Sequence, residues 1–283
     1  MDAPRPPHAR IATIEDCGLS NVIVQRYASA GITRLFEWQA AALALPGVLE
    51  GKQHLVYTAS TSAGKTLVAE LLLLRRLETH GQRAKALVVL PLRALVTQKA
   101  AELSKLLDKT GLTVAPYMTA VGELPMPRRL NVAVCTFEKA GMIVQSMSEA
   151  GRLGEIVAVV IDELHLLGEG QRGANLERTI ARLLLHARRP ASVSRASLAS
   201  SPGAVASSAT PLESTADDAS EGGGSGRGGG LVCGDSTALT LGAAPERRGM
   251  QIIGMSATLP NLPDLQRWLA PPCAGVAPSI MLE

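Results

Sequence analysis

Short runs of apolar and β-branched residues recur along this chain, and longer amphipathic stretches separate them. Apolar runs without polar interruption are typical of strands that are buried on both faces of a sheet. Between them, residues 67–79 and 93–107 repeat apolar positions at the spacing of helices. Because strands and helices alternate, we predict an α/β fold, a parallel sheet with helices on both faces. The predicted strands are residues 55–57, 86–90, 132–135, 157–161 and 251–254.

Residues 190–248 break this alternation. Serine, alanine and glycine predominate there, most of all in the glycine-rich stretch 222–230. Such a sequence buries too little apolar surface to offset the entropy of ordering it, so we predict a disordered insertion. The expected organisation is a flexible N-terminus (1–15), a single lobe (16–189 and 249–270) around the insertion, and a C-terminal tail (271–283).

The composition fits a globular protein. With 283 residues and 46% hydrophobic content, the chain can form one large or two small domains. No apolar stretch approaches the roughly 20 residues that span a bilayer, and the N-terminus lacks the apolar core of a secretory signal. We therefore expect no membrane partner and a location inside the cell.

Cysteine content and charge narrow the chemistry. The four cysteines are far apart and form no C-x-x-C pair, which argues against a zinc site or a disulfide framework. The net charge of +3 is weak for a protein that holds nucleic acid mainly by charge. Arginine pairs such as Arg75-Arg76 are more typical of solvated surface than of a phosphate track.

The first candidate site lies between a predicted strand and the predicted helix 67–79. Residues 59–66 read A-S-T-S-A-G-K-T, which matches G-x-x-x-x-G-K-[ST] except that Ala59 replaces the first glycine. In such a loop, backbone N–H groups surround a nucleoside triphosphate at a helix N-terminus, the lysine neutralises the outer phosphates, and the threonine hydroxyl holds Mg²⁺. The residues expected to bind the nucleotide are Ser62, Ala63, Gly64, Lys65 and Thr66.

An acidic pair follows another predicted strand, 157–161. It consists of Asp162 and Glu163, and the carboxyl ends of buried parallel strands are where α/β sheets place metal and catalytic groups. We expect Asp162 to anchor Mg²⁺ together with Thr66, through water, because Mg²⁺ keeps several water ligands. Glu163 is expected to position and deprotonate the attacking water. With Lys65, these two acids form the expected catalytic set.

Three motifs resemble those of one family. They are Ser-Ala-Gly-Lys-Thr at 62–66, Asp-Glu-Leu-His at 162–165 and Gly-Met-Ser-Ala-Thr-Leu-Pro-Asn at 254–261. In this order they resemble motifs I, II and III of superfamily-two helicases of the Ski-like branch. The resemblance implies the first RecA-like lobe of a P-loop helicase that uses ATP and Mg²⁺.

Further segments resemble one group within that branch. Residues 35–39, 48–52 and 61–72 look most like DNA-repair helicases of the polymerase theta group. In total the resemblance covers about residues 17–189 and 249–270. It implies a nuclear location and a role in DNA repair.

The resemblance places Gln39 in the Q motif, which selects ATP. A glutamine amide can both donate to and accept from the edge of adenine, which suits this role. The residues alone leave another interpretation open, in which Phe36 and Trp38 are core residues of an amphipathic segment and Gln39 is exposed.

A second implied group couples the nucleotide to the nucleic acid. His165 would link the nucleotide site to motif III, in which Ser256 and Thr258 would join Asp162 and His165 by hydrogen bonds. The alternatives are a histidine on a packed turn and a motif III that is a simple turn. A similar tract at 207–210 follows no apolar strand, so we interpret it as coincidence.

Four residues are expected to bind nucleic acid. Pro91 and Arg93 resemble motif Ia and follow a predicted strand at a helix start, where backbone amides suit a phosphate. Thr136 resembles motif Ib, and Arg172 resembles a further element after motif II. Because phosphates carry no base information, these contacts would be independent of sequence. For Arg93 and Arg172, helix-end capping or surface ion pairs remain alternatives.

A second RecA-like lobe, which supplies an arginine to ATP in this family, has no match in the sequence. Such an arginine contributes roughly 10³–10⁵ to the rate, so we expect this chain to bind ATP but to hydrolyse it poorly. The expected partners are single-stranded or forked DNA and the missing lobe. Three alternatives stay open: an RNA helicase of the same branch, a non-catalytic nucleotide-binding lobe, and another P-loop protein such as a small GTPase or kinase.

Overall fold

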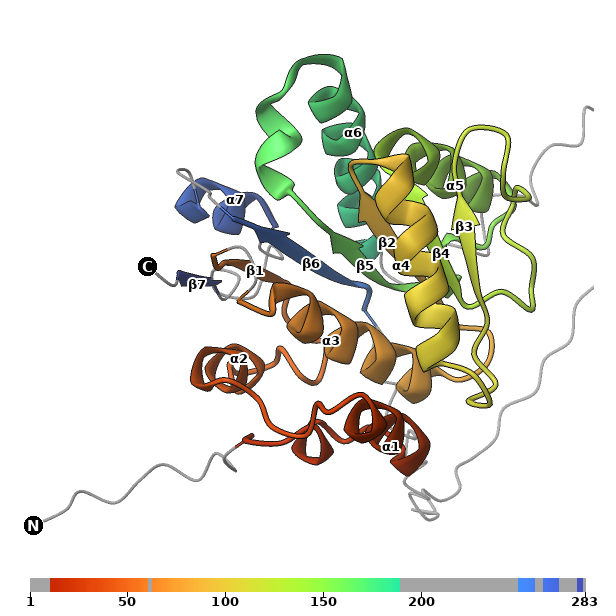
Figure 1. Ribbon diagram of the computed structural model, residues 1–283. Helices are drawn as coiled ribbons and strands as arrows, with labels where there is room; N and C mark the ends of the chain where they lie inside the picture. The colour runs from red at the N-terminus through yellow and green to blue at the C-terminus, as the bar shows by residue number, and fades with distance from the viewer. Residues whose placement is uncertain (1–10, 61–62, 189–248, 258–261, 270–278, 282–283) are drawn as a thin grey trace, which may run out of the picture. The chain divides into compact units, whose positions relative to one another are not determined.

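A seven-stranded sheet forms the centre of the described part of the protein (Figure 1). The computed structural model describes residues 11–60, 63–188, 249–257, 262–269 and 279–281. The strand order is β3-β4-β2-β5-β6-β1-β7, and each described pair of neighbours is parallel. The strands are β1 (Leu55–Thr58), β2 (Lys85–Leu90), β3 (Val114–Tyr117), β4 (Val132–Thr136), β5 (Ile156–Ile161), β6 (Gln251–Ser256) and β7 (Ser279–Met281).

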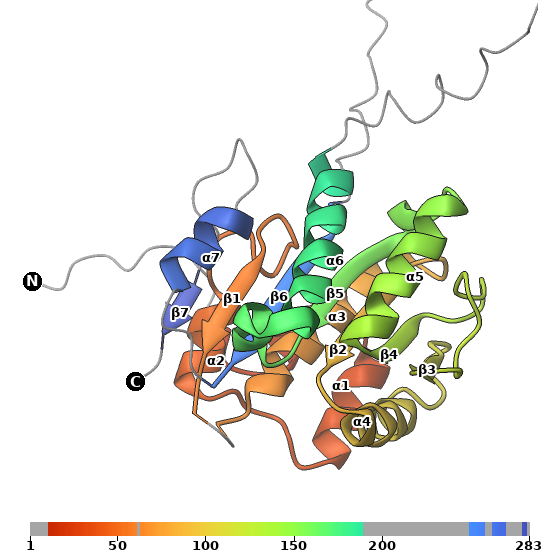
Figure 2. The same cartoon turned by 90° about the horizontal axis from the view of Figure 1, so that it is seen from above.

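Helices cover both faces of this sheet (Figures 1 and 2). One face carries α1 (Asn21–Ser29), α2 (Glu37–Leu43), α3 (Lys65–His80) and α4 (Arg93–Leu106). The opposite face carries α5 (Phe137–Glu149), α6 (Gly170–Arg188) and α7 (Leu262–Leu269). Short 3-10 helices lie at Glu15–Cys17, Leu153–Glu155 and Leu164–Gly168.

Alternation along each strand divides the core into two layers. In β1, Leu55 and Tyr57 pack among α1 to α4, whereas Val56 packs among α5 to α7. In β2, Val88 and Val89 point to opposite layers in the same way. Successive strand side chains face opposite sides of a sheet, so a strand covered by helices on both faces needs apolar residues at every position. This explains the uninterrupted apolar runs.

The predicted fold class is confirmed, and so are the five predicted strands, whose bounds shift by no more than two residues. The strands β3 and β7 were not predicted. The latter lies in the predicted C-terminal tail and pairs with β1 at the edge of the sheet. The predicted flexible N-terminus is too long, because Ile14 is 1% exposed and packs in the core. The predicted insertion 190–248 lies outside the described residues.

The order of the strands sorts the predicted motifs into two neighbouring groups. The strands β1, β6 and β5 are adjacent, and motifs I, III and II follow them. Next to them, β2 and β4 lead into the segments that resemble motifs Ia and Ib. Because all of these strands are parallel, their carboxyl ends meet at one edge of the sheet, where open α/β folds bind ligands. Within the described residues, no helix is both long and apolar enough to cross a membrane.

Candidate nucleotide and nucleic-acid sites

The phosphate loop joins β1 to α3. Gly64 caps the helix with a φ of +79°, and a Cβ there would lie 2.7 Å from Gln39 Nε2, so both the backbone conformation and the space favour glycine. The ammonium of Lys65 donates to the carbonyl oxygen of Ala59 at 2.9 Å, across the loop. Ala59 does not have a positive φ and contributes a backbone atom, so its departure from glycine leaves this contact intact. Ser62 lies outside the described residues.

Gln39 connects α2 to the phosphate loop. Its amide oxygen accepts from the N–H of Phe36 at 2.9 Å, and its amide nitrogen donates to the carbonyl of Gly64 at 3.0 Å. The side chain is 1% exposed, so the alternative of an exposed Gln39 is wrong. The same alternative placed Phe36 in the core, but Phe36 is 62% exposed.

Phe36 is a candidate contact that the sequence did not reveal. Its ring lies beside the phosphate loop, 3.6 Å from where a Cβ on Gly64 would stand. An exposed aromatic ring next to such a loop offers a flat apolar surface to a nucleotide base. Composition and periodicity do not distinguish this ring from a core aromatic, because the difference is one of exposure.

The acidic pair lies at the carboxyl end of β5. The N–H of Asp162 donates to the carbonyl of Val89 at 3.0 Å, which fixes it to β2, and its Oδ1 accepts from the N–H of Glu163 at 2.9 Å. Burial raises the pKa of Asp162, and the hydrogen bond from Glu163 and the nearby ammonium of Lys65 lower it in part. Asp162 and the exposed Thr66 line one cavity, as their proposed Mg²⁺ roles require.

Glu163 adopts a left-handed conformation with a φ of +53°, which is uncommon for a residue other than glycine and is often found at functional sites. Its Oε2 lies 3.2 Å from His165 Nδ1. That nitrogen is also 2.8 Å from Ser256 Oγ. The shorter contact assigns Nδ1 to Ser256, which agrees with a buried Oε2 that has no hydrogen-bond partner among the described residues. An unpartnered carboxylate oxygen is suited to receive a proton from water.

The two described members of the predicted coupling group are in contact. Ser256 at the end of β6 is fully buried, and His165 lies in the 3-10 helix after β5. Their hydrogen bond therefore joins motif II to motif III, as the resemblance implies. Thr258 lies outside the described residues.

The four predicted nucleic-acid residues line one hollow of about 460 Å³ at the ends of β2 and β4. These residues are Pro91, Arg93, Thr136 and Arg172. The Arg93 side chain is exposed and makes no ion pair with any described residue. It is the first residue of α4, so it cannot cap the carboxyl end of that helix. Thr136 caps α5 by accepting from the N–H of Lys139 at 3.4 Å.

Arg172 is held in place by three groups around the hollow. It donates to the carbonyl of Pro91, lies 3.2 Å from Glu138 Oε1 and stacks on the Phe137 ring with its guanidinium 5.4 Å from the centroid. A surface ion pair, the alternative interpretation of Arg172, is therefore present, but it is one of three contacts that the side chain makes. Burial alone would raise the pKa of Glu138, but hydrogen bonds from its own N–H, Thr136 and Arg172 lower it.

The arginine pair Arg75-Arg76 is not solvated surface, so that prediction is wrong. Arg75 donates to the carbonyls of Leu49 at 3.0 Å and Cys17 at 2.6 Å. Arg76 is 5% exposed and donates to the carbonyls of Glu50 and Gly249. Both side chains tie loops to α3, and neither is available as part of a phosphate track.

A second connection that the sequence did not reveal joins α3 to α4. The ammonium of Lys99 pairs with Glu70, on the helix that follows the phosphate loop, and lies 3.2 Å from Glu102 Oε2. Tyr27 donates to Glu70 at 3.1 Å. Burial alone would lower the pKa of Lys99, but the two carboxylates raise it. Nothing in the spacing of these residues indicates that they meet.

Thr66 and Asp162 are the candidate metal ligands of this site. No cluster of three or more histidine, cysteine, aspartate or glutamate residues that could hold a metal occurs among the described residues. The hydroxyl of Thr66 and the carboxylate of Asp162 would offer two oxygen ligands, which would suit Mg²⁺ because that ion is usually held by one or two protein groups, waters and substrate phosphates. Cys17 and Cys135 are buried thiols, and burial raises the pKa of Cys17 to about 11.

Comparison with known proteins shows similarity to helicases. The model of the DEAD/DEAH box helicase family matches residues 38–219. DNA polymerase theta from Mus musculus is 37% identical over 253 residues, which is 89% of this chain and 8% of that protein. Helicase POLQ-like from Homo sapiens is 41% identical over 157 residues, 54% of this chain and 14% of that protein. The chain thus spans a small part of these relatives.

Solved structures share the fold at low identity. S. cerevisiae Dbp5 L327V bound to RNA and ADP BeF3 has a TM-score of 0.60 and 14% identity, covering 97% of this chain and 52% of that chain. The helicase MrfA bound to DNA and AMPPNP has a TM-score of 0.56 and 17% identity, covering 99% of this chain and 30% of that chain. These likenesses agree with a RecA-like lobe.

Proposed function

Because the chain belongs to the DEAD/DEAH box helicase family, we propose that its lobe binds ATP with Mg²⁺ and holds single-stranded or forked DNA by its phosphates. One observation carries this proposal: the nucleotide residues after β1 and β5 and the hollow after β2 and β4 open at the same edge of one sheet. Two ligands bound there would contact neighbouring strands. Binding of ATP can then affect binding of DNA through contacts between these neighbouring strands.

In the proposed nucleotide site, the β- and γ-phosphates replace the Ala59 carbonyl as partners of Lys65. Thr66 and Asp162 would hold Mg²⁺, and Glu163 would position and deprotonate water. Gln39 would contact adenine with its second amide N–H and with the second lone pair of its oxygen, because the bonds to Phe36 and Gly64 use one acceptor site and one donor. The Mg²⁺ would neutralise charge on the phosphates during transfer.

In the proposed nucleic-acid site, Arg93 contributes an exposed positive charge and Thr136 a hydroxyl. Arg172 and the backbone at Pro91 complete the wall of the hollow. Because the residues named here are suited to phosphates, binding would be independent of sequence and would weaken with salt.

Efficient hydrolysis would require an arginine from a second RecA-like lobe, supplied outside the residues described here. In the whole protein, the two lobes would use ATP to translocate along DNA or unwind it. The similarity to DNA polymerase theta and Helicase POLQ-like supports a role in DNA repair, and hence in the nucleus.

Equilibrium binding of a fluorescent ATP analogue, with ATP turnover measured beside it, tests the proposal. We expect Lys65→Ala to weaken nucleotide binding at least about tenfold, because it removes the charge beside the phosphates, and Lys52→Ala, an exposed lysine, to leave it unchanged. Nucleotide binding that survives Lys65→Ala would overturn the assignment. Turnover should stay near background with single-stranded DNA present; strong stimulation would overturn the need for a second lobe.

A parallel titration separates DNA from RNA. Single-stranded DNA and RNA of one sequence should be compared at several salt concentrations, and Arg93→Ala should reduce the salt slope by about one. Tighter binding of the RNA than of the DNA would favour an RNA helicase of the same branch. In that case, only a high concentration of competing DNA should displace the RNA.

A further inference from the structure

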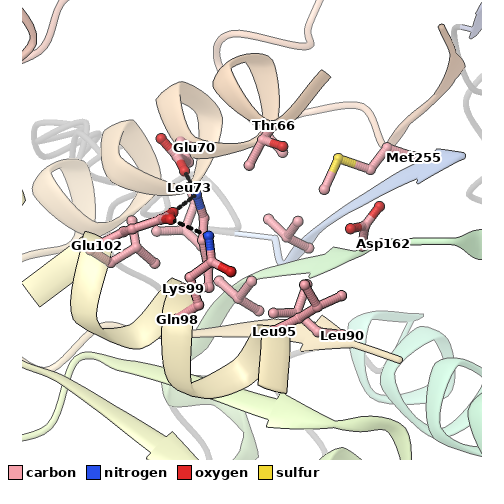
Figure 3. A pocket seen from close by; sticks show the side chains of 14 residues that line it. Thr66, Glu70, Leu73, Leu90, Leu95, Gln98, Lys99, Glu102, Asp162 and Met255 are labelled. Carbon is pink, nitrogen blue, oxygen red and sulfur yellow. Dashed lines mark hydrogen bonds and ion pairs between the residues drawn. The ribbon is translucent and has the colours of Figure 1, made fainter. Parts of the chain in front are cut away.

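A cavity of about 180 Å³ lies between α3 and α4, beside the candidate metal residues (Figure 3). Its apolar lining includes Leu73, Leu90 and Met255, and the 38% exposed Leu95 lies at its rim. An engineered apolar cavity of about 150 Å³ binds benzene, so this one has room for a single aromatic ring. Neither the phosphate loop nor the nucleic-acid hollow accounts for an apolar space at this position.

The two ends of the cavity are polar and differ in what they offer a ligand. At one end, Lys99 lies between Glu70 and Glu102. Those carboxylates also accept from Tyr27 and Gln98, so all four of their oxygens already have partners. This end is a closed network and offers little to a new ligand.

The other end, formed by Thr66 and Asp162, has unused hydrogen-bonding capacity. Asp162 Oδ1 accepts from the N–H of Glu163, whereas its second carboxylate oxygen accepts no hydrogen bond from any described residue. In Figure 3 the Asp162 and Thr66 side chains lie across the cavity from the Lys99 network. A donor or cation placed here would satisfy Asp162.

The charge of the lining selects the sign of the ligand. Three carboxylates and one ammonium line the cavity and leave a net charge of −2. Glu70 and Asp162 are partly buried, and such charges are screened weakly by salt, so an anion is disfavoured and a cation is favoured.

We propose that this cavity binds a small amphipathic monocation, one aromatic ring that carries an ammonium group. The ring lies between α3 and α4 against Leu73 and Leu95, and the ammonium contacts Asp162 and Thr66. Such a ligand is neither nucleotide nor nucleic acid, and binding it does not depend on the proposed ATPase function. It would compete with Mg²⁺ for the same two oxygen groups and would therefore inhibit the nucleotide site.

Benzylammonium is a suitable probe, with benzyl alcohol and benzoate as neutral and anionic controls of similar size. Titrations of the whole chain, followed by protein NMR chemical shifts, give the three affinities. We expect saturable binding of benzylammonium with a dissociation constant of about 1 mM or tighter. Benzyl alcohol should bind at least about fivefold more weakly, and benzoate more weakly still. Equal affinities for the three probes would overturn the proposed charge selectivity.

Two variants locate the ligand. Leu95→Trp fills the rim of the cavity and should abolish binding, while Leu185→Trp places the same side chain on an exposed position of α6 and should leave it unchanged. Asp162→Asn should weaken benzylammonium at least about fivefold and leave benzyl alcohol unchanged. Binding that persists in Leu95→Trp would overturn the site, and equal losses for both probes in Asp162→Asn would overturn the ammonium contact. Nucleotide binding measured separately shows whether the proposed function stands.

Discussion

Gln39 joins two parts of the chain that lie 25 residues apart. Its amide holds the Phe36 N–H on one side and the Gly64 carbonyl on the other, and little water reaches it. Both bonds are partly buried, and the Gly64 carbonyl also accepts from the N–H of Leu67 at 3.2 Å. At this position one side chain therefore fixes both the start of α2 and the cap of α3.

We predict that Gln39→Ala lowers the free energy of unfolding by about 2 kcal/mol, because it removes a buried side chain together with its hydrogen bonds to the Phe36 N–H and the Gly64 carbonyl. Urea unfolding followed by circular dichroism measures the loss. The matched control is Gln145→Ala, which removes an exposed glutamine from α5 and should change stability by less than about 0.5 kcal/mol. Equal effects in the two variants would contradict a structural role for the Gln39 amide.

Asp162, unlike Gln39, is expected to lower the stability of the fold at neutral pH. Burial raises its pKa, so the folded protein binds this proton more tightly than the unfolded chain does. Its contribution is fully present below the ordinary aspartate value of 3.8, and stability is lost as the pH rises through the folded pKa. At neutral pH the charged carboxylate therefore destabilises the fold.

We predict that Asp162→Asn makes the protein more stable at pH 7 and that the gain shrinks as the pH falls toward 3.8. Asparagine keeps an oxygen that can accept from the N–H of Glu163. Thermal unfolding of both proteins between pH 4 and pH 8 measures the difference. A gain that grows toward acid pH would show that the pKa is shifted the other way.

The positions of Lys65 and Asp162 could be predicted because each depends on local order, a strand followed by a short motif. The partners of Gln39, His165 and Lys99 could not, except where family resemblance supplied them. Hydrogen-bond partners are decided by tertiary packing, and nothing in the local sequence shows which loop or helix will lie opposite a side chain.

At the scale of elements, α3 and α4 are joined by the ion pair of Lys99 and Glu70 as well as by apolar contacts. The first helix begins in the phosphate loop, and the second begins at Arg93, in the candidate nucleic-acid hollow. The Lys99 and Glu70 side chains are 18% and 15% exposed. A displacement of either helix would break a largely buried pair, so the two candidate sites are tied together.

We predict that Lys99→Met destabilises the protein by about 3 kcal/mol, because it leaves the largely buried carboxylate of Glu70 without its cation. The double variant Lys99→Met with Glu70→Gln should lose less than the sum of the two single variants. Chemical unfolding of all four proteins measures the coupling. Lys105→Met, at an exposed position of α4, is the control, and strict additivity would show that the pair contributes no coupling.

The strands that the sequence predicted and those it missed differ in burial. The five predicted strands are buried throughout and have continuous apolar runs. The edge strand β3 is only partly buried over most of its length and contains Pro116, which lacks a backbone donor. The other missed strand, β7, is three residues long. Neither carries enough apolar residues to produce a pattern.

On the scale of the whole molecule, the sheet contains strands that precede the predicted insertion in the sequence and strands that follow it. The last helix before it is α6, and the first strand after it, β6, fits between β5 and β1. The register Leu55 to Ile253 and Ala158 to Gln251 places β6 in the middle of the sheet. The insertion therefore separates elements that the fold must bring together.

We predict that replacing residues 190–246 with a Gly/Ser linker of about 12 residues leaves the fold intact. This change halves the loop length roughly twice, so it should raise the free energy of unfolding by about 1 kcal/mol. Thermal unfolding and binding of the ATP analogue check the result. A variant that no longer folds would show that the segment contributes to the core, against the prediction of disorder.

The place of β6 also has a consequence for synthesis on the ribosome. The strand that leads into the phosphate loop ends at Thr58, but its neighbour begins at Gln251. At about 5–20 residues per second, roughly 10–40 s pass between their appearance. During that interval the nascent chain presents an unpaired strand edge with apolar side chains, so chaperone binding should be concentrated in this window.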